Sequence, residues 1–404
     1  IESGYRLARA CMVILSAQHV AQAAGLHTPP LFEVILPMTE SAKEIIDLQR
    51  SFGEVARAVH TSFGMQETHV HTLEVLPLFE RVETLINSGN ILREYVDLVR
   101  QSQGAPPLYL RPFCARSDPA LNSGIVPTTL AIKWALSEYA RFTQETDIAT
   151  YPVIAAGSLP FRGGLAPATV ERFMSEFPGV RTVVIQSAFR YDHPLQDVKA
   201  SLAKIREQVT ESRTEVLPHE RLGEIQEIIP CFEIPYRKTV ESLAPLIAKV
   251  SPYVPKRRER VQHIGLFGYS RQLGAQKLPR AIGFTASCYS LGIPPEFLGM
   301  GAGLRTLQQK GQLSLLKELF PTLQDMLREA GRYVRKESLA ELDLRGIADE
   351  IPFIEEYIGE PLGPRTDSEL KHQDLVSKII RLLEMGAEPK KEMEQAALIR
   401  HSIG

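Results

Sequence analysis

The spacing of apolar residues changes along the chain between two patterns. Residues 1–24 follow the three- and four-residue step of a helix, with apolar side chains such as Leu7, Cys11 and Ile14. From residue 31 onward, short apolar runs alternate with amphipathic segments, and the first run, at 31–36, is favoured as a strand by its length and β-branching. The runs predict strands at 31–36, 71–76, 107–113, 151–155, 182–185 and 263–267, and the segments after them predict helices at 42–59, 81–99, 127–142, 167–177, 195–208 and 281–291.

Six strand-then-helix units in succession predict parallel strands joined by helical crossovers. We expect an α/β fold, a (β/α)8 barrel of the TIM type with many additional helices. Two strands are then still to be found: in residues 228–234, in sequence before Ile1, or in a segment too weak to identify. An open, doubly wound sheet is the alternative.

The last hundred residues are predicted to be almost entirely helical. Residues 313–327 and 370–385 are the clearest amphipathic stretches, and the segment 359–364 has the composition of a turn. We therefore divide the chain into an N-terminal helix at 1–30, a barrel carrying the active site at 31–300, and a helical region at 301–404 packed on the barrel as one continuous unit.

Composition adds few constraints. The 404 residues carry 46 Lys plus Arg against 48 Asp plus Glu, a net charge of −2, so there is no electrostatic reason to expect nucleic acid or an acidic membrane as a partner. Four widely spaced cysteines predict reduced thiols in a cytoplasmic protein. No apolar run is long enough to cross a membrane, and no signal peptide is visible. Because the chain starts with Ile1 inside a helix, we expect its natural N-terminus to lie earlier.

Charged and amide side chains fall just after the predicted strands, at Glu80, Asp118, Arg162, Gln186 and Arg271. In a barrel, this position is the mouth where catalysis takes place. Two carboxylates with open coordination positions suit Mg²⁺ or Mn²⁺. Ordinary loop carboxylates or ion pairs are the alternative interpretation for Glu80 and Asp118.

Four arginines lie in loops or at helix starts, namely Arg116, Arg162, Arg271 and Arg280. Arginine binds phosphate and carboxylate with two parallel hydrogen bonds. Gly163 and Gly164 follow Arg162, and such a loop can bring its backbone N–H groups close to an anion and can move; a plain surface turn is the alternative. Together with the carboxylates, these arginines predict a site for a small, multiply anionic, metal-bound substrate. The basic run 256–260 is interpreted mainly as a solvated face.

No nucleophile elbow, P-loop or dinucleotide-binding glycine motif is found. Several strings, however, resemble one family in its order along the chain. They are LPMTES (36–41), LPLFE (76–80), RPFCARSDPALNSG (111–124), PFRGGLAP (160–167), TVVIQSAFRYD (182–192), GYSR (268–271), PRAIGF (279–284) and PPEFLG (294–299). The chain resembles phosphoenolpyruvate carboxylase, most closely its short, archaeal-type branch.

The resemblance implies a barrel embedded in extra helices and a homotetramer. It implies that phosphoenolpyruvate and bicarbonate give oxaloacetate and phosphate with Mg²⁺ (or Mn²⁺). It assigns Glu80 and Asp118 to the metal, Arg280 to the substrate phosphate, and Arg162 to a mobile catalytic loop. Arg271 and Gln186 line the site, and we add Arg116, Gly163 and Gly164 as substrate-binding candidates.

The implied chemistry begins with attack of bicarbonate on phosphorus, giving carboxyphosphate and the pyruvate enolate. Carboxyphosphate then releases carbon dioxide, which must stay near the enolate and away from water, as a closing loop would ensure. Two departures stand out. The family's catalytic histidine motif is not found, so we expect it to precede Ile1, and Leu121 occupies a position that is lysine in the larger enzymes. An aspartate or malate effector site is traced only to Arg365 and the C-terminal tail.

Two rival functions share these features. Another metal-dependent barrel lyase acting on phosphoenolpyruvate or pyruvate would use the same carboxylates and arginines, and bicarbonate dependence separates it from the carboxylase. A non-catalytic protein that binds an anion or a partner through the C-terminal helices would show no turnover, and Glu80→Ala would leave its function intact.

Overall fold

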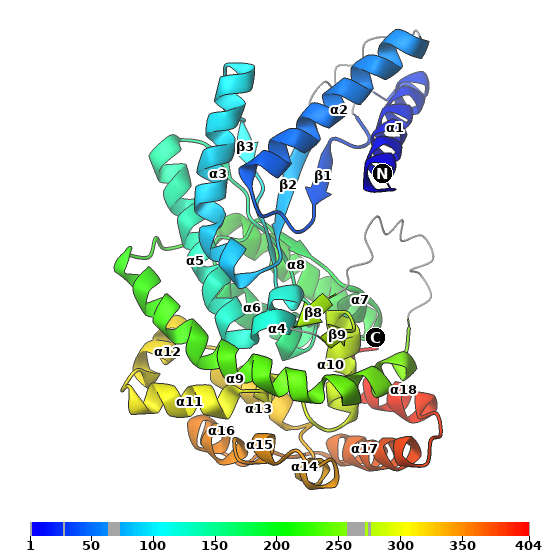
Figure 1. Cartoon of the computed structure of the whole chain (residues 1–404), viewed down its shortest axis with the longest axis vertical. Helices are drawn as coiled ribbons and strands as arrows, with labels where there is room; N and C mark the ends of the chain where they lie inside the picture. Colours follow the sequence, from blue (N-terminus) through cyan, green and yellow to red (C-terminus); the bar gives the residue numbers. More distant parts are fainter. Residues whose placement is uncertain (1, 27–28, 64–72, 257–270, 274–275, 404) are drawn as a thin grey trace.

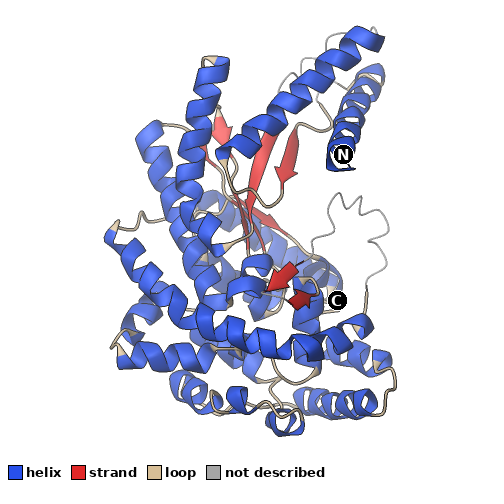
Figure 2. Ribbon diagram, viewed as in Figure 1, coloured by secondary structure: helices blue, strands red, loops and turns tan. Residues whose placement is uncertain are grey.

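A five-stranded parallel sheet forms the centre of the molecule (Figures 1 and 2). The computed structural model describes residues 2–26, 29–63, 73–256, 271–273 and 276–403. Its strands follow each other in chain order across the sheet, and all neighbours are parallel: β1 (Glu33–Leu36), β2 (Glu74–Phe79), β4 (Phe113–Ala115), β6 (Val153–Ala155) and β7 (Thr182–Val184). The order does not reverse within this sheet, as it would in a doubly wound fold.

Helices make every crossover between neighbouring strands, as predicted. The helices of this part of the chain are α1 (Glu2–Ala23), α2 (Ala42–Phe63), α3 (Val82–Gln103), α4 (Ser117–Ser123), α5 (Ile125–Thr146), α6 (Val170–Glu176), α7 (Ser187–Tyr191) and α8 (Leu195–Glu211). The structure is therefore a mixed α/β fold with helical crossovers.

Two predicted strands are placed or divided differently in the structure. The strand expected at 71–76 runs from Glu74 to Phe79 instead and includes Pro77. Pro77 is tolerated because β2 changes partner there, pairing with β1 up to Pro77 and with β4 from Leu78. The run 107–113 divides into β3 (Tyr109–Leu110) and β4, and β3 pairs with β5 (Ala149–Thr150) in a separate two-stranded sheet.

The proposal of a strand at 228–234 is wrong. These residues lie inside α9 (Glu220–Val250), which contains Pro230, Pro235 and Pro245. Its buried residues, among them Ile225, Ile228 and Phe232, recur at helical steps. Burial of this face outweighs the cost of the prolines.

A two-stranded antiparallel hairpin follows, made of β8 (Arg271–Leu273) and β9 (Gln276–Leu278). The strand predicted at 263–267 and most of the GYSR string lie outside the described residues. Arg271 was expected in a loop after a strand but is the first residue of this hairpin, and only its backbone is described.

The C-terminal part is helical, as predicted, and lies at the end of the molecule opposite α1 and α2 (Figure 1). The expected helix at 313–327 is two helices, because Pro321 disfavours helical geometry at Phe320. The helices are α10 (Ala281–Ser290), α11 (Met300–Gln309), α12 (Leu313–Leu319), α13 (Leu323–Gly331), α14 (Lys336–Glu341), α15 (Arg345–Ala348), α16 (Ile351–Ile358), α17 (Asp367–Glu384) and α18 (Lys390–Ile399).

One hydrophobic core runs from α2 to α18, so the sheet and the C-terminal helices share their buried side chains. Residues of α1, with Phe52, Val59 and Leu73, form a smaller separate cluster. Among the helices of the described residues, none is both long and apolar enough to pass through a membrane.

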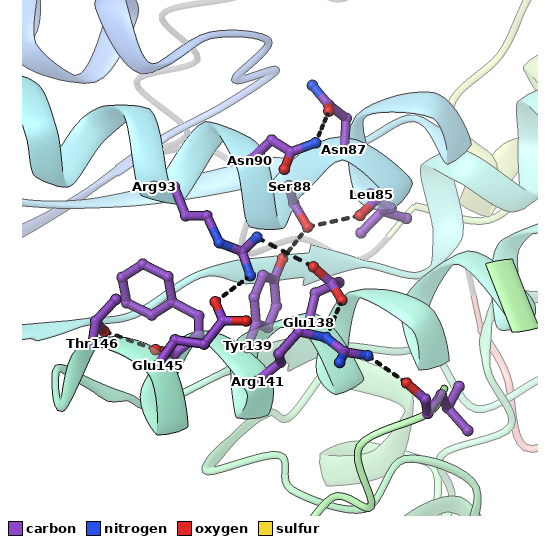
Figure 3. Close-up of polar contacts among 12 residues, drawn as sticks. Leu85, Asn87, Ser88, Asn90, Arg93, Glu138, Tyr139, Arg141, Glu145 and Thr146 are labelled. Carbon is purple, nitrogen blue, oxygen red and sulfur yellow. Dashed lines mark hydrogen bonds and ion pairs between the residues drawn. The ribbon is translucent and has the colours of Figure 1, made fainter. Parts of the chain in front are cut away.

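Charged residues join α3 to α5 (Figure 3). Arg93 contacts Glu138 at 3.2 Å and Glu145 at 2.9 Å, and Arg141 Nε donates to Glu138 Oε1 at 2.8 Å. The Tyr139 hydroxyl donates to Ser88 Oγ at 2.8 Å, also between α3 and α5. We call these six residues the α3–α5 network. Because each charge meets an opposite charge, the network stabilises the packing of two helices that flank the sheet.

Candidate active site

The carboxyl ends of β2 and β4 bring two predicted site residues to the same edge of the sheet. The two strands pair with Leu78 opposite Phe113 and Phe79 opposite Cys114. Glu80 directly follows β2, and Asp118 follows β4 by three residues. Since neighbouring strands lie about 4.8 Å apart, both carboxylates leave the sheet from adjacent positions.

Glu80 is held by the loop that follows β1. Its side chain is 9% exposed, and Oε2 accepts a hydrogen bond from the Met38 backbone N–H at 2.8 Å. Met38 has a φ of 53°, an uncommon left-handed conformation for a residue other than glycine. The strained turn aims a backbone donor at the carboxylate and fixes its orientation.

Asp118 lies in the first turn of α4, which starts directly after β4. The positive end of a helix favours a carboxylate there. Arg116, two residues earlier, turns into the fold: it is 1% exposed, and its Nη1 donates to the Phe161 carbonyl at 3.1 Å.

Arg116 is a buried cation with incomplete hydrogen bonding. Within the described residues, its Nε and Nη2 have no hydrogen-bond partner. Burial lowers its pKa to about 10, although Glu176 and Glu296 act in the opposite direction. A cavity of about 10 Å³ beside it, lined also by Thr129 and Glu176, has room for about one water molecule. Arg116 therefore supports the loop after β6 from within.

That loop, residues 157–165, carries Arg162 in a 3₁₀ turn, η1 (Pro160–Arg162). Arg162 is 7% exposed, and its Nη2 donates to Gln186 Oε1, beyond the end of β7. The Gly157 N–H donates to the Arg162 carbonyl at 2.8 Å, and the Leu165 N–H donates to the Gly157 carbonyl at 2.9 Å. The structure thus brings Arg162 and Gln186 together at the edge that also carries the two carboxylates.

Gly163 and Gly164 have positive φ values of 118° and 69°. In this conformation the Gly163 N–H donates to the Pro160 carbonyl and the Gly164 N–H to the Leu159 carbonyl. Both amides are engaged inside the loop, so contact with an anion requires the loop to rearrange.

The remaining predicted residues lie in three other places. Arg280 is exposed at the N-cap of α10. Arg271 begins the β8–β9 hairpin. Arg365 lies between α16 and α17, where its Nη2 contacts Glu360 Oε1 at 2.8 Å.

Sequence reasoning missed Glu296, which touches the Arg162 loop. Glu296 belongs to a short 3₁₀ turn, η5 (Pro295–Phe297), and is 1% exposed. Its Oε1 accepts hydrogen bonds from the Phe161 N–H at 2.6 Å and from the Tyr289 hydroxyl at 2.8 Å. Burial raises its pKa to about 7, against the hydrogen bonds that lower it. The available signal was a carboxylate inside the otherwise apolar string PPEFLG.

The donor set suits a hard divalent cation. No group of three or more His, Cys, Asp or Glu side chains able to hold a metal occurs among the described residues. Two carboxylates alone match Mg²⁺, which keeps waters and takes oxygens from its substrate. The cationic Arg162 lies on the same edge, so the arrangement suits an anionic substrate that brings its own metal-binding oxygens.

Comparison with known proteins agrees with this chemistry. Residues 5–404 match the family model described as phosphoenolpyruvate carboxylase. A phosphoenolpyruvate carboxylase of Oenococcus oeni is 32% identical over 408 residues, covering 100% of this chain and 80% of that protein. Proteins of the same name from Metallosphaera sedula (37% identity; 94% of this chain, 77% of that protein) and Pyrococcus horikoshii (38%; 80% and 66%) match as well. On a match of this length and identity, the chain belongs to the phosphoenolpyruvate carboxylase family.

Proposed function

We propose that this protein joins phosphoenolpyruvate to bicarbonate and releases oxaloacetate and phosphate. Family membership and the names of the relatives support this activity. The observation that carries it within the structure is the strand register, which delivers Glu80 and Asp118 to the edge where Arg162 meets Gln186.

In this proposal Glu80 and Asp118 hold Mg²⁺ (or Mn²⁺). When bound, the cation supplies positive charge beside the oxygens of the substrate, where negative charge develops during the reaction. The Met38 N–H keeps the Glu80 carboxylate oriented toward the site.

The arginines bind and orient the substrates. Arg162 is more than nine-tenths buried, so its charge acts in a low-dielectric environment and stabilises an anion more strongly than it would in water. Arg280, exposed at the start of α10, offers a guanidinium to the phosphate, and Arg271 of the GYSR string acts beside it in this proposal.

Water exclusion follows from the burial of the Arg162 loop. Residues 158–165 are all buried, and released carbon dioxide would be retained against the enolate beneath such a cover. Opening the loop, as the predicted mobility requires, must break its hydrogen bonds to Glu296 and Arg116.

We further propose that the parallel sheet is part of a (β/α)8 barrel, which its unreversed strand order supports. We also propose that an N-terminal helix at 1–30 precedes two regions, 31–300 and 301–404, which are joined by one continuous core. A cytoplasmic homotetramer inhibited by aspartate or malate completes the proposal. Arg365, 46% exposed on its side chain and paired with Glu360, could exchange that carboxylate for one from such an effector.

Oxaloacetate formation from phosphoenolpyruvate and Mg²⁺, measured with and without bicarbonate on the purified full-length protein, tests the activity. We expect bicarbonate-dependent oxaloacetate and a loss of roughly 10²–10³-fold in Glu80→Ala and Arg162→Ala, because each removes stabilisation of charge at the reacting atoms. Glu145→Gln, on the surface of the α3–α5 network, is the control and should keep the wild-type rate.

Phosphoenolpyruvate consumed at the same rate without bicarbonate would indicate the rival barrel lyase. No turnover by the full-length protein would contradict the enzymatic proposal and leave an anion-binding protein.

A further inference from the structure

The backbone N–H and the backbone carbonyl of Phe161, next to Arg162, are each held by a buried ionisable side chain. Its N–H donates to Glu296 Oε1 at 2.6 Å, and its carbonyl accepts from Arg116 Nη1 at 3.1 Å. Glu296 and Arg116 are each 1% exposed. Charge-assisted hydrogen bonds in such surroundings are stronger than neutral ones and fix direction as well as distance.

Tyr289 extends this arrangement away from the loop. Its hydroxyl donates to Glu296 Oε1 at 2.8 Å, and its ring packs edge-on against Tyr333 at 5.8 Å. We call the Phe161 backbone, Arg116, Glu296 and Tyr289 the loop clamp.

The C-terminal helices contact the far end of the loop clamp. The Arg400 guanidinium lies over the Tyr289 ring at 5.5 Å, and its Nη1 is 2.6 Å from His372 Nε2. His372, wholly buried in α17, packs against Tyr333 at 4.9 Å. An unbroken series of buried contacts therefore leads from α17 and the end of α18 to the residue beside Arg162.

Several polar atoms of this series lack partners. Within the described part of the chain, Glu296 Oε2, Arg400 Nε and His372 Nδ1 make no hydrogen bond. Each such group costs roughly 1–3 kcal/mol when buried, and an apolar core would avoid that cost. The arrangement is thus poorly explained by stability alone.

We propose that Glu296 is a positioning residue for Arg162, acting through the Phe161 backbone, and that Tyr289 and Arg400 tie this position to the helical C-terminal region. The proposal rests on the carboxylase function proposed above. Glu296 does not need to touch substrate, because displacing a catalytic group by about 1 Å can cost about 10²-fold in rate.

Glu296→Leu and Glu296→Gln test the proposal. Leucine removes the acceptor for the Phe161 N–H, and we expect kcat to fall about 10²-fold. Glutamine keeps an acceptor oxygen without the charge and should restore most of that loss.

Glu350 provides a matched control. It is a buried glutamate, 8% exposed, whose Oε2 accepts the Ala302 N–H at 3.2 Å in the C-terminal helices. Glu350→Leu should cost comparable stability and leave kcat of the folded enzyme unchanged.

A double-mutant cycle separates positioning from general damage. If Glu296 acts through Arg162, Glu296→Leu adds no further loss of kcat to Arg162→Ala. Additive losses in the double variant, or an equal loss of kcat in Glu350→Leu, would overturn the proposal.

Hydrogen exchange of the 157–165 segment gives a readout that does not depend on turnover. We expect Glu296→Leu to speed exchange of the Phe161 amide at least tenfold, and Glu350→Leu to leave it unchanged. Faster exchange in Glu296→Leu, together with a wild-type protein that makes no oxaloacetate, would support the clamp and reject the proposed function. Unchanged exchange in Glu296→Leu would reject the clamp whatever the activity.

Discussion

Two polar networks in this molecule, one partly exposed and one buried, are organised differently. In the α3–α5 network, Glu138 lies between Arg93 and Arg141, and the described side chains leave no buried polar atom of this network unpartnered. In the loop clamp, Arg116 and Glu296 hold the backbone carbonyl and N–H of Phe161, yet both side chains retain buried atoms without partners among the described residues.

The difference indicates what each network contributes. Satisfied charges between two helices specify how the helices pack, at little net cost. Unsatisfied charges around a loop are retained only where something other than stability requires them, which is typical of functional sites. Variants that change one network and leave the other intact should therefore separate stability from activity.

The largest expected difference between the two networks comes from replacing one glycine beside each of them with alanine. In Gly163→Ala, the new Cβ would lie 2.7 Å from Ala156 Cβ and 2.9 Å from Arg116 Cγ at a φ of 118°. We expect a loss of about 2 kcal/mol in stability from backbone strain and about 10²-fold in carboxylation rate. Chemical denaturation and the oxaloacetate assay measure the two effects.

Gly89→Ala is the counterpart in α3, where the new Cβ would meet Glu138 Cβ at 3.0 Å. Alanine favours the helix by about 0.5–1 kcal/mol, which offsets the tight contact, so stability should change by less than about 1 kcal/mol. A rate loss as large as that of Gly163→Ala would contradict the separation of the two networks.

Glu138→Leu removes the shared acceptor of the α3–α5 network. Arg93 and Arg141 then lose a partly buried partner, and we expect the free energy of unfolding to fall by about 2 kcal/mol. The expected loss is smaller than for a fully buried ion pair because the Arg93 side chain is 30% exposed. The exposed partner, in Glu145→Gln, should cost less than about 0.5 kcal/mol. Denaturation midpoints test this order, and the kcat of folded enzyme should be unchanged in both variants.

The pH dependence of stability reports on the buried glutamates. Burial raises the pKa of Glu296 to about 7, with Glu329 adding to the effect, while Arg116 and the Tyr289 hydroxyl face the same carboxyl group. A carboxyl pKa raised on folding makes the folded state bind the proton more tightly. This stabilising contribution is complete below the unfolded pKa of about 4.5 and is lost as pH rises to about 7.

Between pH 5.5 and 7 the loss from Glu296 amounts to about 1.5 kcal/mol, and Glu296→Gln should abolish it. Burial also raises the pKa of Glu350 to about 7, so Glu350→Gln should flatten the stability curve similarly. Only Glu296→Gln should change the pH profile of kcat. Identical rate profiles for the two variants would argue against a special role for Glu296.

The smallest expected effects come from removing the hydroxyl groups of two buried tyrosines, one in each network. Tyr289→Phe removes the hydroxyl that donates to Glu296, and Tyr139→Phe removes the one that donates to Ser88. Each should cost about 1 kcal/mol of stability. Only Tyr289→Phe should lower the carboxylation rate; equal rates would indicate that Tyr289 serves packing alone.

The sequence predicted the parallel strands and the polar edge because both depend on local patterns. Glu80 follows one apolar strand directly and Asp118 follows the next by three residues, so their place at the sheet edge follows from strand direction. Helix α9 was missed because its short apolar run at 228–234 was considered as a strand, whereas tertiary burial maintains one helix through Pro230, Pro235 and Pro245.

The direction of side chains beyond a strand end was not predictable. Arg116 follows β4 immediately, but its guanidinium turns inward to the Phe161 carbonyl. Glu296 gave no local sign of its partner, because Phe161 lies 135 residues earlier in the chain. Contacts of this kind depend on how whole elements pack, which residue spacing does not encode.

That separation of 135 residues has a consequence for biosynthesis. At about 5–20 residues per second, the ribosome exposes the Arg162 loop on the order of ten seconds before Glu296 is made. The strands β1 to β7 need only residues up to Val184 and can pair in their order of emergence. The nascent protein can therefore form its sheet first, and the Arg162 loop is secured only after Glu296 has been made.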